Sequence, residues 1–132
     1  MTDKELFKIA QEMTRKSYAP FSKFCVGAAL ECKDGTIFTG CNVENSSYGG
    51  TICAERTAFC KAISEGYHEF SKIMITARPD DGEVFSEAWP CGICRQFMKE
   101  FCDDDFIIMT AADDEHIRSY TMTEILPEGF RL

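Results

Sequence analysis

The sequence lacks long hydrophobic runs. Its longest stretch without a charged residue covers the ten positions 45–54, whereas a helix that crosses a membrane needs about 20 apolar residues. Residues 1–5 are mostly polar and contain nothing like the apolar segment of a signal peptide. We therefore expect a soluble, cytoplasmic protein with no membrane partner.

Basic residues are also scarce. The chain has 14 Lys and Arg against 22 Asp and Glu, so its net charge is -8. Acidic residues cluster at 103–105 and 113–115, and no block of Lys or Arg balances them. A protein that binds nucleic acid normally presents a basic face that displaces counterions from the phosphates. The composition argues against DNA or RNA as a partner and favours a neutral small molecule.

Internal repeats and linker-like segments are absent as well. With 132 residues and a hydrophobic content of 45%, the chain has the length and the apolar material of one folded domain. We expect a single domain over residues 1–132.

Periodic patterns along the chain alternate between helix and strand. Thr2 and Glu5 have the spacing of a capping box, which predicts a helix that ends near Ser17. The later patterns predict strands at 25–32 and 36–43, a helix at 52–65, a strand at 72–77, a helix at 91–102, strands at 106–110 and 117–122, and a helical turn at 123–126. Polar connections are expected at 33–35, 44–51 and 78–90. This order predicts an α/β domain with a mixed sheet and layered helices.

Cysteine is abundant, with eight residues. A disulfide framework is typical of small secreted domains, and the expected location argues against one. Three cysteines differ from the rest, because Cys53 and the pair Cys91 and Cys94 lie at the starts of two predicted helices. At these positions the helix dipole favours the thiolate, which is the form that binds metals.

The three thiolates would converge if the two helices lie side by side. No fourth ligand is evident, because neither His68 nor His116 has a metal-binding partner nearby in the sequence. Three ligands with one open position are typical of catalytic zinc, whereas structural zinc usually has four. The alternatives are a thioredoxin-like redox pair at Cys91 and Cys94 and a zinc site with no catalytic role.

Several motifs together resemble those of one enzyme family. Cys53-Ala54-Glu55-Arg56 and Pro90-Cys91-Gly92-Ile93-Cys94 match the three-cysteine form of the zinc deaminase signature. The segments 18–29 (YAPFSKFCVGAA) and 40–45 (GCNVEN) and the pair Leu126-Pro127 match further. On these motifs the chain resembles the small homotetrameric zinc-dependent cytidine deaminases of the cytidine/deoxycytidylate deaminase superfamily. The resemblance covers nearly the whole chain and implies a three-layer α/β/α sandwich around a mixed five-stranded sheet.

The resemblance implies one zinc ion (Zn²⁺) per chain, held by Cys53, Cys91 and Cys94, and Glu55 as the catalytic proton shuttle. Hydrolytic deamination at C4 of cytosine needs an activated water, a proton for ring atom N3 and a proton for the departing ammonia. Zinc coordination lowers the pKa of water towards about 7, and one carboxylate beside it can move both protons. Arg56 is implied to hydrogen-bond the cysteine sulfurs and to moderate their negative charge.

The same resemblance assigns a set of substrate-binding residues: Phe24, Asn42, Val43, Glu44, Tyr48, Ala54 and Phe130. Phe24 is implied to stack near the base and the Ala54 amide to read the ring carbonyl. Asn42 and Glu44 are implied to bind the hydroxyl groups of the sugar.

Two aromatic positions in this set imply an assembly. Tyr48 and Phe130 match positions that reach into an adjacent site, so the implied assembly is a homotetramer with pockets completed by neighbouring subunits. The chain ends sooner after Phe130 than many relatives do. It also departs from the family pattern at Trp89, where relatives often have Ser or Thr.

The expected function is zinc-dependent hydrolysis of cytidine and 2'-deoxycytidine to uridine and 2'-deoxyuridine with release of ammonia, in pyrimidine salvage. The alternatives are a deaminase of a nucleoside antibiotic such as blasticidin S and a non-catalytic zinc-binding module. The acidic net charge argues against a polynucleotide cytosine deaminase. The lack of a Lys or Arg cluster near the sugar-binding motif argues against a deoxycytidylate deaminase.

Overall fold

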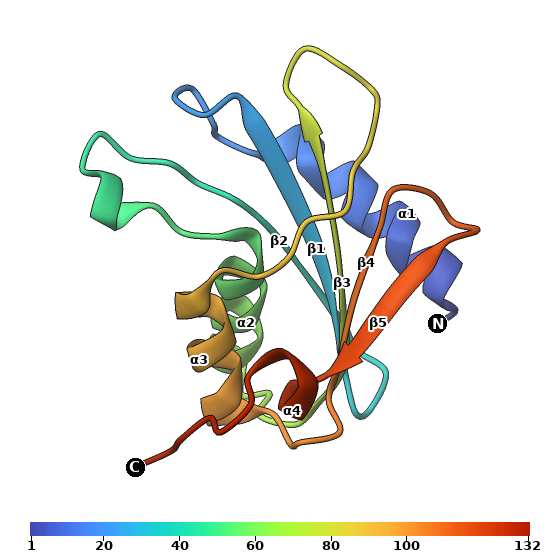
Figure 1. Cartoon of the computed structure of the whole chain (residues 1–132), viewed down its shortest axis with the longest axis vertical. Coiled ribbons are helices and arrows are strands. Elements are labelled where there is room, and N and C mark those ends of the chain that lie inside the picture. Colours follow the sequence, from blue (N-terminus) through green and yellow to red (C-terminus); the bar gives the residue numbers. More distant parts are fainter.

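A mixed five-stranded sheet forms the centre of the computed structural model, which describes residues 1–132 (Figure 1). The strands lie in the order β2-β1-β3-β4-β5. Their bounds are Phe24–Cys32 for β1, Ile37–Cys41 for β2, Phe70–Pro79 for β3, Ile107–Ala111 for β4 and Ile117–Thr121 for β5. Strands β3 and β4 pair in parallel, and the other neighbours pair antiparallel. The predicted mixed sheet of five strands is confirmed.

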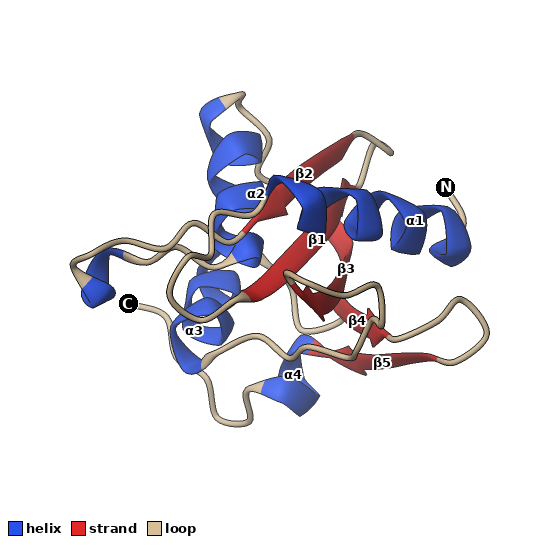
Figure 2. Cartoon of the chain, turned by 90° about the horizontal axis from the view of Figure 1, so that it is seen from above, coloured by secondary structure: helices blue, strands red, loops and turns tan.

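Helices cover both faces of this sheet. The α-helices are α1 (Asp3–Met13), α2 (Ala54–Ser64), α3 (Gly92–Phe101) and α4 (Met122–Ile125), and the short 3-10 helices are η1 (Thr14–Lys16) and η2 (Tyr48–Gly50). Helix α1 lies on one face, and α2 and α3 lie next to each other on the opposite face (Figure 2). The predicted three-layer α/β/α arrangement is therefore confirmed.

Side chains of β1 alternate between two cores, because successive residues of a strand point to opposite faces. Ala28 and Leu30 pack with α2 and α3 in the larger cluster of buried residues. Ala29, between them, packs with Leu6 and Ala10 of α1 in the smaller cluster. The strand is thus buried on both faces, which explains its nearly continuous apolar sequence.

The topology of the sheet and one glycine determine where α2 and α3 lie. Because β3 and β4 are parallel, the chain needs a crossover between them, and α3 forms part of it on the α2 face. On β2, Gly40 lies directly under the start of α2. A Cβ atom there would overlap the carbonyl oxygen of Ala54 and lie 2.6 Å from the nitrogen of Ala58. The missing side chain thus allows the backbone of α2 to rest against the sheet.

Local signals start the helices where the sequence predicts. Thr2 caps α1 through the expected capping box, in which the Thr2 hydroxyl accepts from the Glu5 amide and the Glu5 carboxylate accepts from the Thr2 amide. A second capping box, formed by Thr121 and Glu124, starts α4. Gly66 follows α2 with a φ of +93°, the left-handed conformation that often ends a helix.

Some strand ends differ from the predicted ones, because pairing with a neighbouring strand decides where a strand ends. Strand β3 extends over 70–79 rather than 72–77, since it pairs with β1 from Phe70 to Pro79. Strand β2 ends at Cys41, and Val43 instead forms isolated bridges with Tyr18 and Ile52. The predicted connection at 44–51 contains η2. No helix in the structure has both the length and the apolar character needed to cross a membrane.

Candidate metal centre

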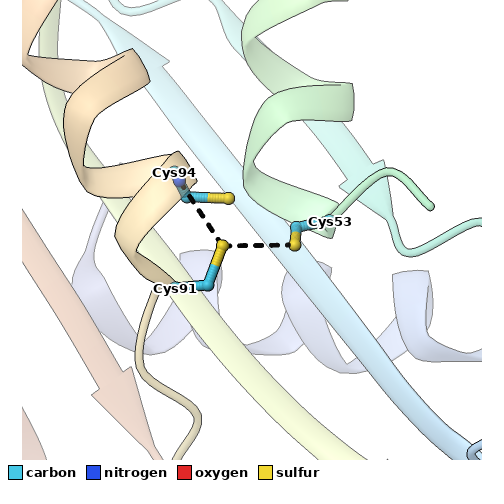
Figure 3. Close-up of side chains that lie close together, drawn as sticks. All are labelled: Cys53, Cys91 and Cys94. Atoms are coloured by element: carbon cyan, nitrogen blue, oxygen red, sulfur yellow. Dashed lines mark hydrogen bonds between the residues drawn. The ribbon is translucent and has the colours of Figure 1, made fainter. Parts of the chain in front are cut away.

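Three cysteines from two helix starts come together on the α2 and α3 side of the sheet. Cys53 is the N-cap of α2, Cys91 is the N-cap of α3, and Cys94 lies in the first turn of α3. Their sulfur atoms all lie within 4.8 Å of one another, and the Sγ atoms of Cys53 and Cys91 are 3.7 Å apart. Figure 3 shows the three side chains pointing towards a common centre.

This geometry fits a zinc ion. Zinc–sulfur bonds of about 2.3 Å in a tetrahedral site place two sulfurs about 3.8 Å apart, and the distance between Cys53 and Cys91 agrees with this value. The other five cysteines are also unpaired, but they do not join this cluster. Three thiolate donors leave one position of a tetrahedral ion open, as in catalytic zinc sites.

The surroundings favour negative charge on the Cys53 sulfur, whereas the hydrogen bond between Cys53 and Cys94 raises the pKa of Cys94. Hydrogen bonding from Cys94, and to a smaller extent from Arg56 and Cys91, lowers the pKa of Cys53 to about 5 against the opposing effect of burial. The Nη2 atom of Arg56 lies 3.5 Å from the Cys53 sulfur and 3.4 Å from the carbonyl oxygen of Thr51. Arg56 therefore holds a positive charge beside the thiolates while it remains tied to the loop before α2.

Glu55 follows Cys53 by two residues and is buried, with 3% of its surface exposed. It lines a cavity of about 160 Å³, whose wall also includes Cys53 and Cys91. Burial raises the pKa of Glu55 to about 7, because the charged carboxylate loses solvation. A carboxyl group in this state can both accept and donate a proton near neutral pH.

Three of the predicted substrate-binding residues line the same cavity: Phe24, Asn42 and Ala54. The side chain of Asn42 connects the end of β2 to the start of β1. Its Oδ1 atom accepts from the Val26 amide at 2.9 Å, and its Nδ2 atom donates to the Phe24 carbonyl at 2.8 Å. The amide group therefore has a fixed orientation and keeps one donor hydrogen and one acceptor lone pair for a ligand.

Glu44 lies outside the cavity wall and organises a neighbouring turn. Its carboxylate accepts from the amides of Phe21 and Ser22 at 2.9 and 3.1 Å and from the Ser22 hydroxyl. The hydrogen bond from the Ser22 side chain, assisted by those from the two amides, lowers the pKa of Glu44. Of the roughly four acceptor sites of a carboxylate, three are in use, so one remains.

The remaining predicted contacts lie apart from the cavity. Tyr48, on η2, is 76% exposed and contacts Phe21 with ring centroids 5.8 Å apart. Phe130 is 62% exposed, near the chain end that projects beyond α3 in Figure 1. Val43 is also exposed. The structure of one chain thus brings the predicted metal ligands close to Phe24, Asn42 and Ala54 but leaves these three side chains facing outwards.

The chain end is nevertheless attached to α3. The carbonyl oxygen of Phe130 accepts from the Gln96 side chain at 3.1 Å. The Arg131 guanidinium donates to the carbonyl oxygens of Lys99 and Cys102 at 2.6 and 2.7 Å. These contacts hold the Phe130 carbonyl and the Arg131 side chain against α3 and the residue that follows it, while the Phe130 ring remains exposed.

Some residues that line the cavity are not among the predicted site residues. Trp89, Ala88 and Thr51 come from the segments that precede the cysteines, and Val26 and Ile75 come from the sheet. The sequence could have predicted that Trp89 lines the site, because it lies only two residues before Cys91. The two strand residues carry no such signal, because they have the same apolar character as ordinary core residues.

Comparisons with known proteins agree over almost the whole chain. Residues 1–110 match the family described as the cytidine and deoxycytidylate deaminase zinc-binding region. A cytidine deaminase of Sporosarcina psychrophila is 41% identical over 130 residues, which cover 98% of this chain and 92% of that protein. A probable cytidine deaminase of Dictyostelium discoideum is 44% identical over 133 residues, with coverage of 98% and 86%.

A solved structure has the same fold. The crystal structure of cytidine deaminase from Burkholderia pseudomallei superposes with a TM-score of 0.86 at 38% identity, and the match covers 98% of this chain and all of that one. The cysteine cluster at two helix starts, the sheet order and these similarities agree with the resemblance in the sequence motifs. The chain belongs to the cytidine and deoxycytidylate deaminase family and contains its zinc-binding region.

Proposed function

We propose that this protein is a zinc-dependent cytidine deaminase. It hydrolyses cytidine and 2'-deoxycytidine to uridine and 2'-deoxyuridine and releases ammonia. One observation carries the proposal: three cysteine sulfurs converge, and two of these cysteines, Cys53 and Cys91, line one cavity together with a buried glutamate, in a chain similar to cytidine deaminases along nearly its full length.

The residues at the centre have distinct roles. Cys53, Cys91 and Cys94 hold the zinc ion, which when bound acts as a Lewis acid and lowers the pKa of water. Glu55 accepts a proton from the attacking water, delivers one to ring atom N3 and later delivers one to the departing amine. Arg56 offsets part of the negative charge of the three thiolates, and its hydrogen bond to Cys53 supports this role.

The cavity suits a nucleoside better than a nucleotide. No Lys or Arg lines it, so a phosphate group would have no cationic partner there. Phe24 offers a ring for stacking on the base, and the amide of Ala54 reads the ring carbonyl. Asn42 and Glu44 bind sugar hydroxyl groups through the hydrogen-bonding capacity that their local contacts leave free. We keep Val43, which lies between them in the chain, as a further substrate-binding residue.

The active form is a homotetramer in which neighbouring chains complete each pocket. Support comes from Tyr48 and Phe130, which are exposed aromatic side chains on segments with an ordered backbone. Exposed large aromatic groups are enriched at protein interfaces, where they anchor a partner. Phe130 then acts in the site of an adjacent subunit.

We place the enzyme in the cytoplasm, in pyrimidine salvage, as a single domain over residues 1–132. All eight cysteines are unpaired in the structure, which suits a reducing compartment. The nucleoside product of the proposed reaction supports the metabolic assignment, because it is a free pyrimidine nucleoside without phosphate.

An ultraviolet assay of cytidine loss tests the function. Purified protein should consume cytidine and release one ammonia per uridine, lose this activity with a zinc chelator, and regain it when zinc is returned. Blasticidin S and cytidine monophosphate serve as competing substrates. Consumption of blasticidin S without cytidine would favour the antibiotic deaminase, and zinc-loaded protein that acts on neither would indicate a non-catalytic zinc module.

A further inference from the structure

The indole of Trp89 separates the catalytic cavity from a second, outer depression. On one side Trp89 lines the catalytic cavity together with Glu55 and Cys91. On the other side it lines a surface pocket together with Arg118 and Tyr120 of β5. Trp89 is 36% exposed, so it forms part of the cavity rim rather than of the core.

Contacts from β5 hold this indole in place. The Tyr120 ring meets it edge to face, with centroids 5.1 Å apart and an interplanar angle of 77°. The Arg118 guanidinium lies 5.2 Å from the indole centroid, within the range of a cation–π contact. Arg118 is fixed in turn by the Tyr120 hydroxyl at 2.7 Å and by the Glu87 carboxylate at 3.3 Å. These contacts, called here the β5 support, restrict rotation of the indole.

Trp89 lines the cavity together with the residues that the proposed reaction uses, Glu55 and Cys91. It is two residues before Cys91, whereas Phe24 and Asn42 enter from the start of β1 and the end of β2. In the proposed placement, with the base stacked on Phe24 and its reacting carbon near Glu55 and Cys91, the exocyclic amine would face the part of the wall that Trp89 shares with these two residues. The cavity is also small, at about 160 Å³.

We propose that Trp89 is a specificity-determining residue that limits the size of the leaving amine. This inference rests on the proposed deaminase function and adds a structural cause for substrate choice. The fixed indole leaves room for an unsubstituted amine and excludes an alkylated one. The β5 support, chiefly Tyr120, is a positioning element that acts through Trp89.

N4-methylcytidine is the direct probe. Its hydrolysis breaks the C4–N bond, places the oxygen of water on C4 and gives uridine and methylamine; one hydrogen of water goes to N3 and the other to the amine. In Trp89→Ser, kcat/KM for N4-methylcytidine relative to cytidine should rise by about 10- to 200-fold, the range expected for relief of one excluded methyl group. The control substrate is 2'-O-methylcytidine, enlarged at the sugar, whose ratio to cytidine should not change.

A matched pair of variants tests the β5 support. Tyr120→Ala removes the ring beside Trp89 and should raise the N4-methylcytidine ratio in the same direction as Trp89→Ser, but less. Tyr120→Phe keeps the ring and loses only the hydroxyl that binds Arg118, so its ratio should stay closer to that of the wild type.

Fluorescence gives a readout that does not depend on turnover, because Trp89 is the single tryptophan of the chain. Titration with uridine, the product, should produce a saturable change in Trp89 emission, and Tyr120→Ala should shift the emission of the free protein. Uridine binding that is measured by dialysis but leaves the emission unchanged would overturn the inference.

The substrate ratios distinguish a failure of the proposed function from a failure of the proposed role of Trp89. Wild-type protein that fails to deaminate cytidine contradicts the proposed function itself. Active wild-type protein whose N4-methylcytidine ratio is unaffected by Trp89→Ser, or whose two methylated substrates gain equally, contradicts only the role of Trp89. If Trp89→Ser does not fold, the Tyr120 pair and the fluorescence titration decide the outcome.

Discussion

The contact between Gly40 and α2 leads to a sharp prediction about the metal centre. Gly40→Ala places a Cβ atom 2.6 Å from the Ala58 nitrogen and even closer to the Ala54 carbonyl oxygen. Both partners are helix backbone, which cannot rotate away as a flexible side chain could. Because the interior is close-packed, α2 must retreat from the sheet as a unit, and its N-cap and first turn carry Cys53 and Glu55.

The size of this movement follows from the distances. Ordinary contact with a Cβ atom begins at 3.4 Å, so relief of the 2.6 Å contact alone requires a shift of about 0.8 Å. Metal–ligand distances tolerate only about 0.2 Å, and a misplacement of about 1 Å can cost about 100-fold in rate. Gly40→Ala should therefore lower zinc affinity and kcat together, kcat by about 100-fold, and lower the free energy of unfolding by about 1–3 kcal/mol.

Gly27→Ala is the matched control on the opposite face of the sheet. Its Cβ atom would meet the backbone of Ala10 in α1 and of Thr14 in η1, so the cost in stability should be similar, but neither element carries a metal ligand. Zinc content by elemental analysis, kcat for cytidine and thermal unfolding by circular dichroism distinguish the two variants. A folded Gly40→Ala protein with full zinc content and wild-type kcat would refute the reasoning, and so would equal zinc loss in Gly27→Ala.

Three further predictions concern individual residues. The double variant Cys91→Ala/Cys94→Ala should contain no zinc, because one thiolate cannot hold the ion alone; one zinc per chain in elemental analysis of this variant would disprove the ligand set. Glu55→Ala should keep its zinc and its fold but lose deamination by several orders of magnitude, since one carboxylate serves all the proton transfers; substantial activity at normal zinc content would place the shuttle elsewhere. Phe130→Ala should raise KM, because a contact between a base and an aromatic ring contributes about 1–3 kcal/mol, and mixed tetramers of Glu55→Ala and Phe130→Ala chains should regain part of the activity. Fully active monomers in sedimentation, or no recovery in verified hybrids, would contradict the role in an adjacent subunit.

Local features of the chain could be predicted from its sequence because their causes lie within a few residues. The capping box of Thr2 and Glu5 and the placement of Cys53 and Cys91 at helix starts are of this kind. The strand–helix alternation likewise predicted the layered fold. The family resemblance, carried by motifs around these cysteines, then predicted the zinc and the activity.

Other features depend on residues far apart in the chain, and no local pattern encodes them. The convergence of Cys53 with Cys91 requires that α2 and α3 share one face of the sheet, which the crossover between β3 and β4 decides. The ring contact between Trp89 and Tyr120 joins the segment before α3 to β5. In the sequence Gly40 looks like any other glycine in a strand. Its close approach to the Ala54 carbonyl exists only when α2 packs over β2. Helix capping and hydrophobic periodicity act over one or two turns, whereas packing between elements depends on which surfaces meet when the whole chain folds.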